Sequence, residues 1–416
     1  MWKSGYWKPL TLTALLVSCA MLGGCWDYVE LENRAIIVGL GIDELPPQRY
    51  KGKEMRMYQL IIQVVEPTEQ GGGSGSGGSG GSGGGGMGGG AMGGGAQGPQ
   101  KGYTNFTVVA SSLADGIERI VNKSDRLPNM AHLQFIGLGE KVSKKGINEI
   151  YDFFSRFPQM RRHTEIAVLT GDIAPYFVTP SATEPTPALH IAEMVDTIQR
   201  TVNMPEVNFG TVSKSTRKNI PFLLLKLSLD PNNQIVVNEA AVFKHFRMAG
   251  VVNKGQAGDL SILQDEIQRG ILQFSCYGGK KAGLQILDGK AKIKPSMVQG
   301  KPNIRFEVEL ETELMEYQCL GASFKEAKTI AKLEKRYGAE IKKRLERTGQ
   351  ELIKKYRADL FRLGIRLKKN PEMYKMIRDN PEQFFGDLTM EVKVDLKIRN
   401  IGNSVQTPKS ETLQQK

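Results

Sequence analysis

The stretch that decides the fold is residues 103–121, YTNFTVVASSLADGIERIV, which predicts a strand followed directly by a helix. The first eight residues are rich in β-branched and aromatic side chains, as strands are. Ser112 and Asp115 have the spacing of a helix-capping box, and the apolar residues after Ser112 recur at helical spacing. A strand that feeds directly into a helix is typical of layered folds in which helices cover a sheet.

The same alternation continues on both sides of this stretch. Residues 55–65 (MRMYQLIIQVV), 132–138 (HLQFIGL) and 165–169 (EIAVL) predict further strands. Ser143 is expected to cap a helix that Pro158 stops. The apolar stripe of that helix would be Ile147, Ile150, Tyr151 and Phe154. This order predicts an α/β (mixed α+β) fold with a mixed or parallel sheet and helices packed on it.

Residues 71–99 interrupt this pattern with a tract of glycine and serine (GGGSGSGGSGGSGGGGMGGGAMGGGAQGP). Such a tract has almost no apolar side chain to bury and much backbone entropy to lose, so it predicts a disordered loop. Strand-like segments flank it, and a long insertion between two strands costs little closure entropy. We therefore expect one N-terminal α/β domain, residues 25–179, with an insertion at 71–99.

The middle region, residues 180–285, is expected to be a sheet-rich domain. It opens with a helix that carries Leu189, Met194, Val195 and Ile198 at helical spacing. Strand candidates follow at residues 222–229, 235–237, 240–243 and 248–252, and the last of these could return as a hairpin partner.

The C-terminal region, residues 286–402, is expected to be an α/β domain with a long amphipathic helix. Strands are expected around 291–293, at 304–314 (IRFEVELETEL) and at 388–398 (LTMEVKVDLKI), where apolar and polar residues alternate. Ser323 and Glu326 have the spacing of another capping box. The apolar stripe after them is Ile330, Leu333, Tyr337, Ile341, Leu345, Leu352 and Tyr356. A polar tail, 403–416, completes this three-domain organisation.

The first 24 residues are typical of an export signal that ends at a lipid-modified cysteine. Lys3 and Lys8 precede an apolar run over residues 10–22, which is too short to span a bilayer as a helix. The run ends in Leu22-Gly23-Gly24-Cys25, which resembles the bacterial lipobox. We expect residues 1–24 to be a lipoprotein signal peptide and Cys25 to be the lipid attachment site, which holds the body on the extracytoplasmic face of the cell membrane. An ordinary signal peptide with a chance cysteine is the alternative.

Composition and motifs argue against catalysis. The net charge of +12 suits a solvated basic surface, anionic lipid or wall polymer in an exported chain, and we expect no nucleic-acid partner. Outside the glycine-rich tract the sequence contains no Gly-x-Ser-x-Gly elbow, there is no phosphate-binding loop, and the histidines have no metal-ligand spacing. We expect no catalytic residue, no metal and no cofactor. The histidines are His132, His163, His190 and His245.

Two smaller patterns leave alternatives open. Arg156, Arg161 and Arg162 form a cationic cluster after a predicted helix, where they could pair with the helix C-terminus or dock on an acidic patch of a partner. Cys276 and Cys319, the cysteines that follow Cys25, could pair in an oxidising compartment or remain two unlinked thiols.

Four segments resemble one known family in order along the chain. Cys25-Trp26-Asp27 with AIIVGLGID (35–43) resembles the start of the Ger(x)C-type spore germination lipoproteins, the C subunits of germinant receptors. HLQFIGLGE (132–140), AAVFK (240–244) and YRADLFRLG (356–364) resemble later segments of that family. The resemblance covers nearly the whole chain except the glycine-rich insertion. Residues 371–385 also depart from it, because they contain no tryptophan.

The resemblance implies a three-domain lipoprotein on the inner membrane of a bacterial spore. It also implies partners, namely the integral-membrane A and B subunits of a germinant receptor, membrane lipid through acylated Cys25, and a role in nutrient-triggered germination through protein contacts. The alternative function is a solute-binding lipoprotein that delivers a ligand to a transporter. A two-lobed binding protein would repeat one α/β pattern, whereas here the alternation occurs once. A lipid-anchored hydrolase is a third and weaker alternative.

Overall fold

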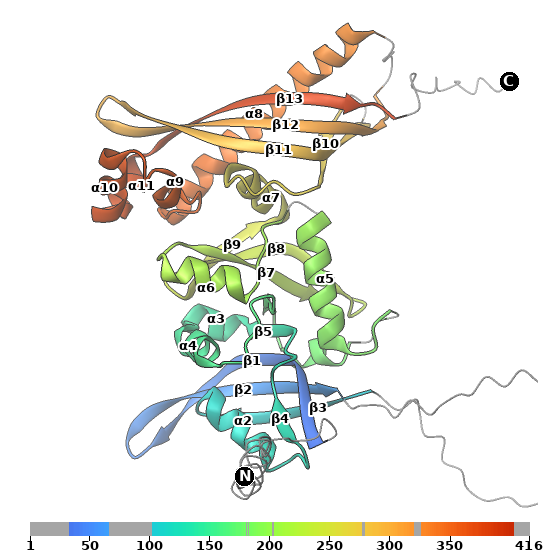
Figure 1. The fold of residues 1–416 in the computed structure, drawn as a ribbon, viewed down its shortest axis with the longest axis vertical. Helices are drawn as coiled ribbons and strands as arrows, with labels where there is room; N and C mark the ends of the chain where they lie inside the picture. The colour runs from blue at the N-terminus through green and yellow to red at the C-terminus, as the bar shows by residue number, and fades with distance from the viewer. Residues whose placement is uncertain are drawn as a thin grey trace, which may run out of the picture.

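The computed structural model describes residues 33–65, 102–179, 181, 183–201, 204–276, 279–319 and 326–402. The predicted signal peptide, Cys25, the glycine-rich insertion and the polar tail lie outside the described residues. The described chain forms two sheets, one of nine strands and one of four strands. Figure 1 shows the four-stranded sheet at the top of an elongated molecule and the larger sheet below it.

The larger sheet is mixed, with parallel strands at its centre and antiparallel strands at both ends. The central pairs β1–β5, β5–β6 and β6–β7 are parallel, whereas β3–β2–β1 and β7–β8–β9 are antiparallel. The order across the sheet is β3 (Tyr103–Ala110), β2 (Lys53–Val65), β1 (Arg34–Tyr50), β5 (Phe135–Gly139), β6 (Glu165–Leu169), β7 (Phe222–Leu229), β8 (Ile235–Lys244) and β9 (Arg247–Asn253), with β4 (Leu127–Asn129) paired to β1.

Helices cover both faces of this sheet, and this confirms the predicted mixed fold with helices on the sheet. Alternate residues of a strand point to opposite faces. Ile136 and Leu138 therefore belong to one core, whereas Phe135, which precedes them, belongs to the other. The first core is covered by α2 (Leu113–Val121), α3 (Glu140–Lys145), α4 (Asn148–Arg156) and α6 (Phe209–Arg217). The second core is covered by η2 (Ala174–Phe177), α5 (Pro187–Thr201) and α7 (Lys254–Leu263).

The parallel pair β6–β7 joins the predicted N-terminal and middle domains within one sheet. Ala167 of β6 is paired with Leu225 of β7. Phe135, Leu169 and Leu225 also share the core that continues into the second sheet. The boundary expected after residue 179 therefore falls between strands that are hydrogen-bonded to each other, and the three-domain division stays a prediction.

The structure confirms one predicted cap and corrects another. The Ser112 hydroxyl accepts a hydrogen bond from the Asp115 amide at 3.1 Å, as a capping residue does. Ser143 does not cap a helix, because it lies buried inside α3. That helix ends at Gly146, whose φ of +128° suits a glycine, and α4 then begins after Ile147 without a side-chain cap.

The second sheet has the order β10 (Ile271–Ser275), β11 (Lys281–Val298), β12 (Lys301–Tyr317) and β13 (Thr389–Asn400). The predicted long helix is α8 (Ala327–Tyr356), and its expected stripe from Leu333 to Tyr356 is buried. Glu326 is the N-cap residue but makes no side-chain capping bond, and Ser323 lies outside the described residues. Three short helices fill the connection to β13, namely α9 (Leu363–Arg366), α10 (Pro371–Asp379) and α11 (Pro381–Asp387).

Helix α7 lies between the two sheets and joins them (Figure 1). Asp259 of α7 is 3 % exposed and accepts hydrogen bonds from Arg344 Nε and Thr348 Oγ1 of α8, both at 2.8 Å. The Tyr356 hydroxyl at the end of α8 donates to the Val251 carbonyl of β9 at 3.0 Å. Within the described part of the chain, no helix is long and apolar enough to cross a membrane.

Candidate functional site

The sequence-predicted site residues are not brought together. Cys25 lies outside the described residues. His132, His163 and His245 are exposed on separate loops, and His190 is half-buried on α5. The described ranges contain no group of three or more His, Cys, Asp or Glu side chains that could hold a metal ion. That the protein needs no metal remains a prediction.

The arginine cluster after α4 is divided between two environments. Arg156 lies in the last turn of α4 and pairs with Asp152 one turn earlier on the same helix at 2.8 Å. Arg161 and Arg162 lie exposed in the following loop, where the Arg162 carbonyl accepts a hydrogen bond from the Gly210 amide at 2.8 Å. Both side chains are therefore open to solvent, and Arg162 lies beside α6.

Cys276 and Cys319 form a disulfide with a Cα–Cα distance of 5.8 Å. Cys276 follows β10 and Cys319 follows β12, so the bond joins two ends of the four-stranded sheet. The pair therefore supports the sheet rather than offering a reactive thiol.

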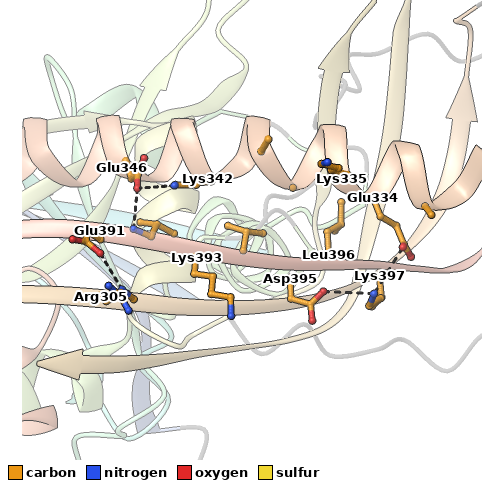
Figure 2. Close-up of a pocket in the computed structure, with 15 residues that line it drawn as sticks. Arg305, Glu334, Lys335, Lys342, Glu346, Glu391, Lys393, Asp395, Leu396 and Lys397 are labelled. Atoms are coloured by element: carbon orange, nitrogen blue, oxygen red, sulfur yellow. Dashed lines mark hydrogen bonds and ion pairs between the residues drawn. The ribbon is translucent and has the colours of Figure 1, made fainter.

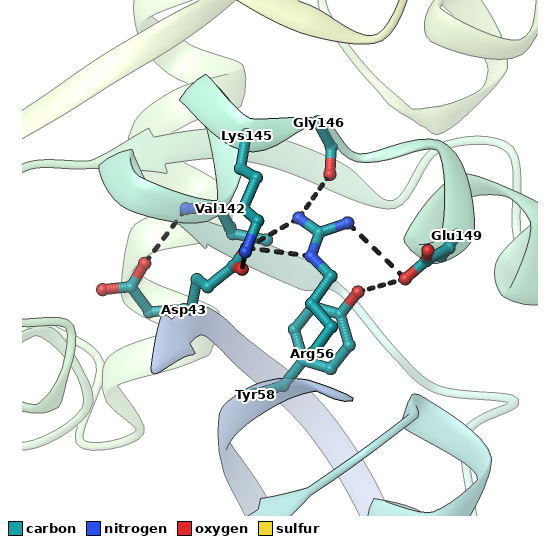
Figure 3. A network of polar contacts seen from close by, with 8 residues as sticks. Asp43, Arg56, Tyr58, Val142, Lys145, Gly146 and Glu149 are labelled. Atoms are coloured by element: carbon teal, nitrogen blue, oxygen red, sulfur yellow. Dashed lines mark hydrogen bonds and ion pairs between the residues drawn. The ribbon is translucent and has the colours of Figure 1, made fainter. Parts of the chain in front are cut away.

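A network of charged side chains fixes the β1–β2 hairpin to the helices above it (Figure 3). Arg56 Nη2 donates to Glu44 Oε2 at 2.7 Å and to the Gly146 carbonyl at 2.8 Å. Lys145 forms a second ion pair with Glu44. Burial acts to raise the Glu44 pKa, but the hydrogen bonds from Arg56 and Lys145 outweigh it and hold the pKa below its ordinary value. Glu44 is therefore ionised, and its carboxylate pairs with both Arg56 and Lys145.

Tyr58 and Asp43 of the same network both have raised pKa values. Burial and the hydrogen bond to Glu149 raise the pKa of Tyr58 well above its ordinary value. Burial also raises the pKa of Asp43, although its Oδ1 accepts the Val142 amide at 3.3 Å. Through these contacts the network holds α3 and α4 against the β1–β2 hairpin.

A charged cleft beside β6 contains one carboxyl group with a strongly altered pKa. Its volume is about 530 Å³, and Glu165, Gln199 and Asn208 line it. Burial raises the pKa of Glu165 to about 8, and the hydrogen bond that Gln199 Nε2 donates at 3.0 Å only partly opposes this. Glu165 is therefore largely protonated at neutral pH. The residues that line this cleft include no Ser, Thr, Cys or Lys side chain.

A groove of about 760 Å³ runs between α8 and the outer edge of β13 (Figure 2). An edge strand presents unpaired amides and carbonyls, which make it a template for pairing with another chain. Two carboxylates of α8 occupy part of this edge, because Glu346 accepts the Val392 amide and Glu334 accepts the Ile398 amide, each at 3.0 Å. The helix glutamates therefore shield both ends of the exposed edge.

The side chains that line this groove are mostly charged and mostly paired with one another. Arg305 and Glu391 are 2.9 Å apart, and Lys397 lies 3.9 Å from Glu334 and 3.7 Å from Asp395. Such alternating charge gives specificity and orientation to a protein contact more than it gives affinity. The groove suits a protein partner better than a single small charged ligand.

The described structure therefore belongs to the class of α+β proteins with two mixed sheets, and it carries charged grooves. Family comparison gives this class a specific identity. The model described as the spore germination protein N-terminal domain matches residues 27–225, and the model described as spore germination B3/GerAC like, C-terminal, matches residues 238–402. The chain belongs to the Ger(x)C family of spore germination proteins.

Individual relatives agree with this assignment along nearly the full chain. The chain is 23 % identical to spore germination protein KC of Bacillus subtilis, over 95 % of this chain and 96 % of that protein. It is 20 % identical to spore germination protein B3 of the same organism, over 92 % of this chain and 95 % of that protein. The fold is similar to the crystal structure of the GerBC protein, with a TM-score of 0.54 and 16 % identity over 87 % of this chain and 97 % of that chain.

Proposed function

We propose that this chain is the lipid-anchored C subunit of a nutrient germinant receptor, needed for nutrient-triggered germination. The observation that carries the proposal is the match of two germination-family models, in order, from residue 27 to residue 402. A role in spore germination follows from the family. The receptor partners, the lipid anchor and the mode of action are the finer parts of the proposal.

The chain acts by contact with the integral-membrane A and B subunits of the receptor, on the extracytoplasmic face of the spore inner membrane. The charged groove beside β13 and the exposed Arg161 and Arg162 are surfaces that a protein partner could recognise. Lipid on Cys25 would keep these surfaces close to the membrane, where a high effective concentration favours even weak contacts. This role requires no catalytic residue, metal or cofactor.

The experiment that tests the partner assignment is a pull-down of the tagged chain from detergent-solubilised spore membranes. Co-purification of the integral-membrane receptor subunits at near-constant ratio supports the proposal. Recovery of transporter subunits in their place would support the solute-binding alternative and contradict the receptor assignment. A matched variant with Arg161→Gln and Arg162→Gln, compared at equal protein level, tests whether the exposed arginines contribute to that recovery.

A further inference from the structure

A second cleft, of about 640 Å³, lies where the large sheet meets the short helices of the C-terminal region. Its lining comes from three separate places, namely the segment after α6, the turn between β8 and β9, and the chain from the end of α8 to α11. These elements are seen one above the other in Figure 1. Ligand sites commonly occupy clefts of 300–1,000 Å³ where domains meet.

The charge of this cleft is strongly unbalanced. Five permanent cations line it, against the two carboxylates Asp359 and Glu382. Glu382 lies 3.6 Å from Lys244, and Asp359 is buried and accepts the amides of Leu363 and Gly364. The five cations are Lys218, Lys244, Arg357, Lys368 and Arg378.

Three of these cations have no ion pair within the described part of the chain. Lys218, Arg357 and Lys368 are exposed; Lys218 follows α6, whereas Arg357 and Lys368 both belong to the chain between α8 and α10. Positive charges that converge on one concave surface raise the local concentration of anions. An anion in the cleft would therefore gain several favourable interactions without breaking an ion pair of these three cations.

The backbone around the cleft is also unusual. Asn219, His245 and Arg357 have φ of +52°, +49° and +44°, in the left-handed region that residues other than glycine seldom adopt. Each such residue costs of order 1 kcal/mol or more, and such conformations cluster at binding and catalytic sites. All three of these residues line the cleft.

Partly buried apolar side chains form the rest of the wall. Ile220, Ile365, Tyr374 and Ile377 are each half-buried and line the cleft. A cleft with apolar walls and cations from three sides suits a ligand that has an apolar body and a negative group. It is less suited to a fully polar anion, which would leave these apolar walls without a partner.

We propose that this cleft binds a small organic carboxylate with an apolar body. The carboxylate would lie among Lys218, Arg357 and Lys368, and the body would contact Ile365, Tyr374 and Ile377. Lys218 lies between α6 and β7, beside the nine-stranded sheet, whereas Lys368 lies between α9 and α10 in the C-terminal region. The bound ligand would therefore also strengthen the contact between the nine-stranded sheet and the C-terminal helices. This site goes beyond the receptor role and does not depend on it.

The test uses the purified full-length chain in detergent, with benzoate, benzamide and inorganic phosphate as probes. Saturation-transfer NMR measures binding directly, with detergent alone as the blank. We expect benzoate to bind at millimolar or lower concentration, and at least fivefold more tightly than benzamide or phosphate. Equal binding of benzoate and benzamide would contradict the role of charge. Equal binding of benzoate and phosphate would contradict the role of the apolar wall, and no benzoate binding would overturn the site.

Variants separate the cleft from general surface charge. The double variant Lys218→Gln, Lys368→Gln should weaken benzoate binding about five- to tenfold, since an exposed ion pair contributes up to about a factor of five. The matched control, Lys332→Gln with Lys343→Gln on the exposed side of α8, removes the same charge and should bind as the parent does. The variant Arg357→Asn should also weaken binding, and it should fold normally because asparagine adopts the left-handed backbone readily. Equal loss in the control would overturn the proposal, and thermal melting checks that each variant is folded.

Discussion

Removing the cation beside buried Asp259 should destabilise the junction between the two sheets. Asp259 is 3 % exposed and receives Arg344 Nε at 2.8 Å, and the Arg344 side chain is 30 % exposed. Removal of one partner of a fully buried ion pair costs about 3–5 kcal/mol. Because water partly reaches Arg344, we expect Arg344→Met to lower the free energy of unfolding by about 2 kcal/mol, which for a chain of this length corresponds to roughly 2–4 °C in melting temperature.

The loss should depend on pH in a defined direction. Burial raises the pKa of Asp259 above its ordinary value, and Arg344 opposes this. Without Arg344 the folded-state pKa rises further, so folding favours the protonated form more strongly. An acid with a raised folded pKa destabilises the protein above its unfolded pKa, and this cost disappears as pH falls. The deficit of Arg344→Met should therefore be larger at pH 7.5 than at pH 5.

Circular dichroism at the helix band, followed during thermal and urea unfolding, measures this effect because α8 is the longest helix described. The matched control is Lys343→Met, an exposed position on the same helix that should change the melting temperature little. Asp259→Asn keeps the hydrogen-bonding shape and should cost less than Arg344→Met. The reasoning is refuted if Arg344→Met melts as the parent does, or if its deficit grows towards pH 5.

Three further perturbations test other parts of the structure. Glu165→Gln should be more stable than the parent by an amount that grows between pH 5 and pH 8, by up to roughly 1.4 kcal/mol per pH unit, because folding raises the pKa of Glu165 to about 8; urea midpoints that differ equally at both pH values would contradict this. Replacing Cys276 and Cys319 by serine should cost about 2–4 kcal/mol in urea unfolding, since 43 residues separate them, and an unchanged midpoint would argue against the disulfide. Deleting residues 71–99 should change the free energy of unfolding, followed by thermal melting, by less than ~1 kcal/mol, because Val65 and Tyr103 pair directly. A larger loss of stability would mean that the insertion packs on the body.

Local patterns in the sequence were sufficient where an element has one buried and one exposed side. Helix α8 was predicted from its apolar stripe. β13 likewise alternates buried and exposed residues, as a strand on a two-layer sheet does. These elements are long or strongly periodic, and each sequence pattern fits one type of element.

Elements without such a pattern were missed. Helix α7 is buried on all sides from Ala257 to Leu263, so it has no polar face, and it contains Gly255 and Gly258, which disfavour helix. Its Asn253 and Gln256 form a capping box, which was the available signal. Helix α6 was missed for a different reason, because it is short and its capping residue Asn208 was not recognised.

The clefts could not be predicted, because they form from residues far apart in the chain. The cation cleft joins Lys218 with Lys368, and the network of Figure 3 joins Glu44 with Glu149. Sequence showed a basic composition but not where the charge gathers. The pairing of Cys276 with Cys319 was left open for the same reason, since spacing along the chain does not give distance in space.

The measurement that tests the central claim most directly is nutrient-triggered germination of spores with the parent chain, with no chain, and with Cys25→Ala, the last at a protein level equal to the parent. If the chain is an anchored receptor subunit, null spores should respond slowly or not at all to at least one nutrient. Cys25→Ala spores should be impaired in the same response, because release from the membrane lowers the effective concentration beside the partners. Germination that bypasses nutrient receptors should be unchanged. Null spores that germinate normally with every nutrient tested would contradict the account.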